Sequence, residues 1–155
     1  MTRVRDGTGR TAQFASPGGL AVDPRNGIIY VSNGDKICKI TPNDWVVTTL
    51  AGQDNQYGLR DGTGTGVLFD AAAGLAVDRH GRLFAADYNN NLLRMITPDG
   101  VVSSIPFQFI DGTALEYPGL KPRTVAIDAS GNMYVTKSDD TEPIISQIFK
   151  LTPVN

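Results

Sequence analysis

The 155-residue sequence contains one cysteine and one histidine. Cys38 alone cannot form an internal disulfide or a thiolate cluster, and His80 alone cannot build a multi-histidine zinc site. Charged residues make up only 19% of the sequence, and the 14 Lys and Arg nearly balance the 16 Asp and Glu, which leaves a net charge of −2. The basic surface that phosphate binding requires is missing. We therefore expect no nucleic-acid partner.

Long apolar runs are missing too. No stretch approaches the roughly 18 apolar residues of a membrane-spanning helix, and no apolar segment follows the N-terminal MTRVRDGTGR as it would in a signal peptide. We expect no membrane partner, and the compartment stays open. The sequence also lacks GxSxG, HExxH and Walker motifs. We therefore expect no catalytic residues and no cofactor.

Glycine, proline and strand-forming residues are plentiful instead. The 17 Gly and 9 Pro separate short runs that are rich in Val, Ile and Thr. Such runs are typical of β-strands, and the separating residues are typical of turns. The length suits one ordinary domain. Composition alone therefore predicts an all-β fold in a single unit, residues 1–155.

The sequence repeats itself three times. Each copy has a DGT motif followed, 17 positions later, by the aspartate of an AVD or AID motif. These aspartate pairs are Asp6 and Asp23, Asp61 and Asp78, and Asp111 and Asp128. The copies span approximately residues 6–52, 61–105 and 111–155, and a period of this length is typical of propeller blades.

Each copy predicts a four-stranded antiparallel meander, because strand-like runs alternate with Gly, Asn and Thr-Pro. The second aspartate of each pair should close the first turn by accepting a hydrogen bond from an amide two residues on. A following glycine should supply the positive φ that the turn needs. These glycines are Gly27, Gly81 and Gly131. The third copy reaches Asn155 before a fourth run, so we expect its blade to lack an outer strand of its own.

The pattern resembles NHL repeats, and the second copy carries it best in FAADYNNNLLRMITPDGVVSSI. This resemblance implies three blades, which are half of a six-bladed β-propeller. A half-ring leaves two blade flanks bare, and monomers rarely expose such large apolar surfaces. We expect either a second copy of the chain to close the ring by two-fold symmetry, or the chain to be a piece of a longer propeller.

Loop residues on one face of the predicted propeller are the candidate binding surface. The connections from the fourth to the first strand and from the second to the third strand emerge there, and they carry aromatic, amide and charged side chains. The candidates are Tyr57, Arg60, Tyr88, Asn89, Arg123, Lys137, Asp139 and Asp140. The alternative is that these are ordinary solvated loop residues.

Two acidic motifs raise the question of a metal. The DYNNN segment, residues 87–91, spaces its oxygen atoms as a calcium loop does, but it lacks the glycine and the distal glutamate of an EF-hand. We predict a structural turn. Asp6, Asp61 and Asp111 stand before inner strands and could line a ring around the axis. Local hydrogen bonds to backbone amides explain them without a cation.

These observations favour a non-catalytic module that binds a protein or peptide, or that serves as an assembly scaffold. The alternative is a fragment of a calcium-dependent propeller hydrolase, because related propellers include lactonases with a metal on the central axis. His80 enters neither hypothesis, since we expect it to be exposed in a turn. Cys38 alternates with its neighbours in a predicted strand and should be packed.

Overall fold

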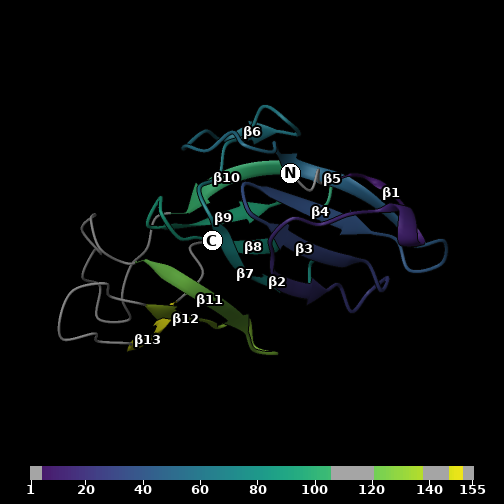
Figure 1. Ribbon diagram of the computed structural model, residues 1–155. Helices are drawn as coiled ribbons and strands as arrows, with labels where there is room; N and C mark the ends of the chain where they lie inside the picture. Colours follow the sequence, from purple (N-terminus) through teal and green to yellow (C-terminus); the bar gives the residue numbers. More distant parts are fainter. Residues whose placement is uncertain (1–4, 106–120, 138–146, 152–155) are drawn as a thin grey trace.

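The computed structural model describes residues 5–105, 121–137 and 147–151. These residues form three antiparallel sheets, one for each sequence repeat (Figure 1). The first sheet contains β1 (Gly7–Thr8), β2 (Pro17–Val22), β3 (Ile29–Asn33), β4 (Lys36–Ile40) and β5 (Val46–Gly52), with a short 3-10 turn η1 (Gly9–Thr11) after β1. The second contains β6 (Gly62–Thr63), β7 (Ala72–Val77), β8 (Leu83–Asp87), β9 (Leu92–Ile96) and β10 (Val101–Ile105). The third contains β11 (Pro122–Ile127), β12 (Met133–Lys137) and β13 (Gln147–Leu151).

The predicted meanders are confirmed. In the first two sheets each long strand pairs antiparallel with the next strand along the chain, in the orders β2-β3-β4-β5 and β7-β8-β9-β10. The third sheet has the order β11-β12-β13. The predicted absence of its outer strand, and the third DGT motif at Asp111, fall outside the described residues. The described residues contain no helix that is long and apolar enough to cross a bilayer.

The first two sheets each contain the four predicted strands and a fifth, two-residue strand that the sequence did not predict. The DGT motif supplies the extra strand, because β1 pairs with β5 and β6 pairs with β10 at the outer edge. Asp6 and Asp61 therefore do not stand before inner strands. They lie at the rim of their sheets, on the far side from the inner strands β2 and β7, so they cannot converge on a central axis.

The first turn of every repeat is built as the sequence predicts. The carboxylate of Asp23 accepts a hydrogen bond from the amide two residues on, at 2.9 Å, and Asp78 and Asp128 do the same at the same distance. Gly27, Gly81 and Gly131 have φ angles of 73°, 79° and 86°. Only a residue without a Cβ adopts this conformation at low cost, which explains the glycine in each turn.

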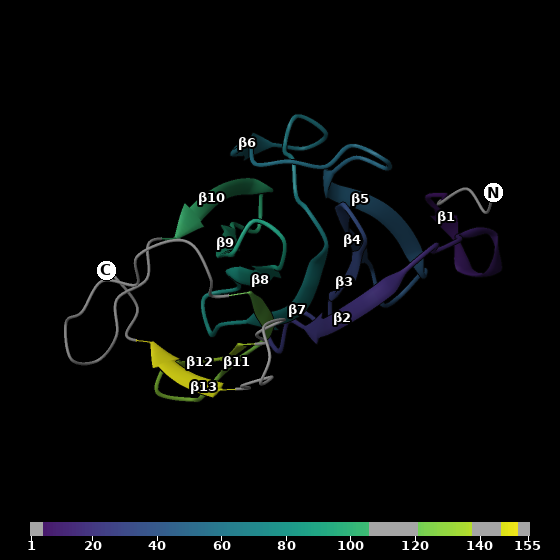
Figure 2. The ribbon, with the colours of Figure 1, turned by 60° about the vertical axis from the view of Figure 1, so that its left-hand side comes forward.

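The inner strands β2, β7 and β11 lie side by side, and the remaining strands of each sheet fan outward from them (Figure 2). This arrangement brings backbones so close that side chains are excluded. A Cβ added to Gly74 in β7 would lie 2.6 Å from Thr124 Cα in β11. Ser32 reinforces the contact between the first two sheets, because its hydroxyl donates to Ala73 O at 2.6 Å.

The core lies between the sheets and forms two clusters, one at each junction. At the first junction Ala21 and Tyr30 of the first sheet pack with Leu75 and Leu83 of the second. At the second junction the set is Ala76, Phe84, Val125, Met133 and Val135. The second sheet is therefore apolar on both faces and packs against a neighbouring sheet on each side.

Candidate functional site

One end of the three sheets, which we call the loop face, carries the starts of the inner strands and the turns between second and third strands. A pocket of about 220 Å³ opens on this face. Small residues dominate its lining, namely Ser16, Gly18, Gly34, Ala71, Ala72 and Ala73, with Tyr88 and Arg123 as the large side chains. The pocket therefore collects residues from all three repeats, which the sequence separates by about 50 positions.

Tyr88 and Arg123, two of the predicted site residues, come together at this pocket. The Arg123 guanidinium carbon lies 5.1 Å from the centre of the Tyr88 ring, and the Lys121 ammonium lies 5.2 Å from it. Cations at this distance from an aromatic ring are attracted to its face. The rim of the loop-face pocket is thus aromatic and positively charged, although the protein as a whole carries a net charge of −2.

A half-buried acid follows one of the residues that line the pocket. Asp35 follows Gly34 in the turn between β3 and β4, and burial raises the pKa of its carboxyl group. A hydrogen bond from the Ala71 backbone acts in the opposite direction. Ala71 itself has a φ of 58°, a left-handed conformation that is uncommon for a residue with a Cβ. The pocket lining therefore includes a residue in an uncommon backbone conformation, and a partly desolvated acid lies behind it.

The other predicted residues are distributed around the pocket. Asn89 donates to the carboxylate of Asp70 at 2.8 Å, so its amide stabilises the turn. Lys137 ends β12 and pairs in register with Pro122, next to Arg123. Asp139 and Asp140 fall outside the described residues. The sequence missed Lys121 and the small lining residues, because nothing local marks them as neighbours of Tyr88.

Tyr57 and Arg60 lie outside the pocket lining. The segment that carries them neighbours the Tyr88 turn, since Asn90 donates to Gly58 O at 2.7 Å. Tyr57 is exposed. The backbone oxygen of Arg60 accepts a hydrogen bond from Arg94, which gives this part of the loop a structural role. The prediction that the loops share one face agrees with this placement, but the candidates do not form one site.

The DYNNN segment forms the predicted structural turn. Asp87 is fully buried, and its two carboxylate oxygens accept hydrogen bonds from the Asp70 amide, the Asn90 amide group and Arg94. Burial raises the pKa of Asp87, against the lowering effect of these donors. The segment is thus held by protein donors. Among the described residues, no three His, Cys, Asp or Glu side chains are grouped to hold a metal ion.

Arg94 connects this turn to the outer rim. Its side chain is fully buried and pairs with Asp87 and Asp61, both at 2.8 Å, while its guanidinium carbon lies 5.0 Å from the centre of the Phe69 ring. Asp61 also accepts hydrogen bonds from the amide and hydroxyl of Ser104, 43 residues away. Burial opposes ionisation of Asp61, but these bonds and Arg94 leave its pKa lowered.

Asp6 and Asp61 therefore have a structural role, as predicted, but their hydrogen bonds are not the local ones that the sequence predicts. Asp6 repeats the arrangement of Asp61 in the first sheet, where it binds the amide and hydroxyl of Thr49 at 2.7 and 3.0 Å. The motif fastens the extra outer strand to its neighbour. Cys38 is buried as predicted, and burial raises the pKa of its thiol to about 11.

No protein-family model matches the chain. A curated relative, Protein SUPPRESSOR OF QUENCHING 1, chloroplastic, from Arabidopsis thaliana, is 34% identical over 140 residues, which cover 88% of this chain and 12% of that protein. The chain thus spans a small part of the relative's length. The NHL assignment stays a prediction.

Solved structures define the fold class. A gluconolactonase from Xanthomonas campestris superimposes with a TM-score of 0.63 at 16% identity, over 91% of this chain and 45% of that one. A calcium-binding regucalcin from Agrobacterium tumefaciens gives a TM-score of 0.56 at 13% identity, over 90% of this chain and 46% of that one. The chain therefore has a propeller-like fold and spans less than half the length of these two propellers.

Proposed function

We propose that the chain is a non-catalytic propeller module that assembles through its two open flanks. One observation carries the proposal: the sequence GLAV occurs in both β2 and β7, but its leucine is covered in only one of them. Leu75 of β7 is 7% exposed because the first sheet covers it, whereas Leu20 of β2 is 63% exposed. The first sheet thus presents a surface that the same fold buries one repeat later.

The opposite flank offers the matching surface. At the first junction Leu75 meets the pair Ala21 and Tyr30, which face each other across β2 and β3. The same positions in the third sheet are Ala126 and Tyr134, which pair in register in β11 and β12. Ala126 is exposed and Tyr134 half-buried. The chain therefore carries both halves of its first junction on its two free flanks.

This self-complementarity favours a second copy as the occupant. If the third sheet of one copy covers β2 of the other, and the reverse, two contacts close a ring by two-fold symmetry. Covering Leu20 and Val22 would contribute about 1 to 2 kcal/mol each through the hydrophobic effect. The remaining blades of a longer chain would make the same contact, and the experiment below separates the two arrangements.

Light scattering of the 155-residue chain tests the proposal. We expect a mass of twice 16.6 kDa that Leu20→Asp converts to 16.6 kDa. Leu59→Asp is the matched control, because Leu59 is also exposed, at 55%, but lies in the loop after β5 and not on the flank. A folded wild-type chain that stays at 16.6 kDa would contradict pairing of two copies and leave a longer propeller as the arrangement.

We propose that the assembled module binds a protein or peptide at the loop-face pocket. Its apolar floor suits a side chain, and the cations of Lys121 and Arg123 around Tyr88 suit an acidic neighbour. Selection from a displayed peptide library should enrich sequences with an acidic residue beside an apolar one. Arg123→Ala should weaken their binding about tenfold, and enrichment that Arg123→Ala leaves unchanged would argue against this pocket.

A calcium-dependent hydrolase of the lactonase kind is the second candidate. The similarity to a gluconolactonase and to a calcium-binding regucalcin favours it at the level of the fold. Calorimetric calcium titration combined with a lactone hydrolysis assay tests it. Stoichiometric calcium binding together with hydrolysis that stops on chelation would replace the non-catalytic proposal.

A further inference from the structure

The end of the sheets opposite the loop face, which we call the turn face, carries the Asp23, Asp78 and Asp128 turns. An arginine closes the first junction here. Arg25 reaches from the first sheet to the second and donates to His80 O at 2.7 Å. Its guanidinium lies directly over Gly81, where it fills the space that a Cβ would take. The turn of the second sheet is thereby covered by its neighbour.

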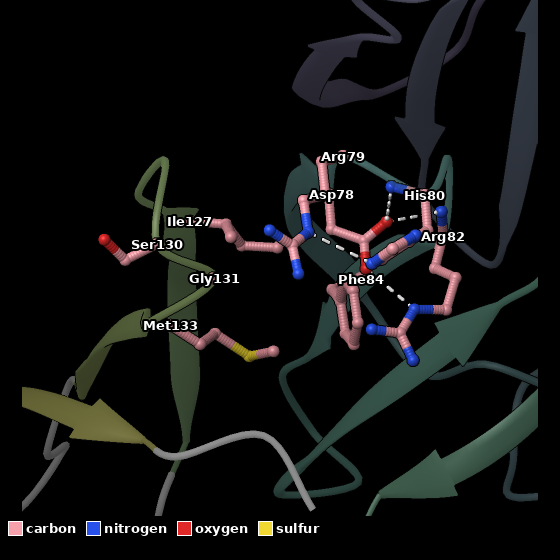
Figure 3. Close-up of a pocket in the computed structure, with 9 residues that line it drawn as sticks. All are labelled: Asp78, Arg79, His80, Arg82, Phe84, Ile127, Ser130, Gly131 and Met133. Atoms are coloured by element: carbon pink, nitrogen blue, oxygen red, sulfur yellow. Dashed lines mark hydrogen bonds and ion pairs between the residues drawn. The ribbon is translucent and has the colours of Figure 1, made fainter. Parts of the chain in front are cut away.

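At the second junction, no arginine in the described part of the chain covers the corresponding glycine. The residue two positions after Asp78 is His80, which is shorter than the Arg25 found two positions after Asp23. No described atom lies within 4 Å of a Cβ added to Gly131, the counterpart of Gly81. A pocket of about 210 Å³ opens instead between the second and third sheets (Figure 3). We call it the turn-face pocket.

One wall of the turn-face pocket carries a positive charge. The guanidinium of Arg79 points across the pocket toward Ile127 (Figure 3). Within the described part of the chain Arg79 makes one hydrogen bond, from Nε to His80 Nε2 at 3.1 Å, and no ion pair. The acid in this wall, Asp78, is already neutralised by Arg82 at 2.7 Å. Arg79 is thus an available cation.

The rest of the lining is mixed, because the polar side chains of Arg82 and Ser130 lie beside three apolar ones. The apolar side chains are Phe84 of the second sheet and Ile127 and Met133 of the third. Phe84 and Met133 are almost fully buried. A guanidinium binds a carboxylate through two parallel hydrogen bonds, and an apolar wall receives the hydrocarbon part of the same molecule. The volume is below the roughly 300 Å³ at which pockets for drug-sized ligands begin. The site therefore suits a small molecule or a single side chain.

We propose that the turn-face pocket binds a small carboxylate that bears an apolar group. Arg79 holds the carboxylate, and Phe84, Ile127 and Met133 contact the apolar group. A free aromatic acid and the C-terminal residue of a peptide share this chemistry. The proposal does not depend on ring closure, because the pocket is formed by two sheets of one chain.

The single histidine provides a direct assay, because its ring lines the pocket and gives one set of imidazole resonances. Titration with benzoate should shift these resonances saturably, and N-acetylphenylalanine tests the peptide-terminus form. Arg79→Gln should weaken benzoate binding about tenfold. Arg10→Gln, at an exposed arginine of η1, should leave it unchanged. Benzyl alcohol, which lacks the carboxylate, should not bind.

A second variant tests the pocket by closing it. His80→Arg restores an arginine at the place of Arg25, so it should fill the space over Gly131 and abolish benzoate binding measured by ligand-observed NMR. Circular dichroism verifies that the variant folds. Equal benzoate affinity in Arg79→Gln or in folded His80→Arg, equal binding of benzyl alcohol, or no saturable shift at millimolar benzoate would each overturn the proposal. Light scattering of the same samples measures whether two copies pair, so failure of the ring proposal can be told apart from failure of the pocket proposal.

Discussion

The buried pair of Arg94 and Asp87 allows a precise prediction, because the first sheet shows how a repeat is built without it. Cys38 has the register position of Arg94, since Cys38 pairs with Thr49 as Arg94 pairs with Ser104. In the same repeat Asn33 takes the place of Asp87, and it likewise accepts a backbone hydrogen bond from 17 residues upstream. Cation and anion are thus both missing from the first sheet.

The single substitution Arg94→Cys should destabilise the fold strongly. It leaves the Asp87 carboxylate fully buried without its cation and removes the hydrogen bonds to Leu68 O and Arg60 O. Breaking one partner of a buried pair costs about 3–5 kcal/mol. The double variant with Asp87→Asn recreates the Asn33 and Cys38 combination and should recover about 2 kcal/mol of that loss.

Urea unfolding of the wild type, both single variants and the double variant measures this coupling. Arg10→Cys serves as the exposed control and should change the free energy of unfolding by less than about 0.5 kcal/mol. Losses from Arg94→Cys and Asp87→Asn that add within about 0.5 kcal/mol would refute the reasoning. A changed m-value would show that a variant altered the compactness of a state, and only variants with equal m enter the cycle.

Three further predictions concern the packing of the inner strands, the reactivity of the Cys38 thiol and the stability of the fold at low pH. Gly74→Val should lower the melting temperature in a thermal scan, because even its Cβ would lie 2.6 Å from Thr124 Cα and such overpacking costs about 1–3 kcal/mol; an unchanged temperature would contradict this packing. Cys38, whose pKa burial raises to about 11, should react with a thiol reagent at pH 8 only after unfolding in urea, and rapid labelling of the folded chain would be inconsistent with its burial. The hydrogen bond from Arg25 lowers the pKa of Asp23, and the pKa of Asp61 is lowered as well. Their contribution to stability is present above the unfolded pKa of about 3.9 and is lost as pH falls through the folded values. Denaturant midpoints should therefore drop below pH 4, and by less in Asp23→Asn; equal drops would count against this linkage.

Local features were predictable from the sequence. The turns at Asp23, Asp78 and Asp128 involve hydrogen bonds over two to four residues, so the motif alone specifies them. The strands follow from the same alternation of apolar runs and turn residues. The repeat then places each strand in its sheet.

Features that depend on distant partners were not predictable. Asp6 binds a residue 43 positions away. The prediction of local hydrogen bonds therefore missed that this motif fastens an outer strand. Lys121 meets Tyr88 only because two repeats pack together. The difference between Arg25 and His80 is visible in the sequence, but its consequence appears only when the junctions are compared in space.

The contact between flanks is the central claim, and cross-linking tests it most directly. One copy carries Val22→Cys on β2, which is 50% exposed, and the other carries Ala126→Cys on β11. The native thiol is buried and should not react. After mixing, a short bismaleimide should cross-link the two different copies in high yield. The control replaces Val22→Cys by Asn43→Cys, in an exposed turn, and should give a much lower cross-linking yield. Equal yields from these two positions would contradict closure of the ring through β2 and the third sheet.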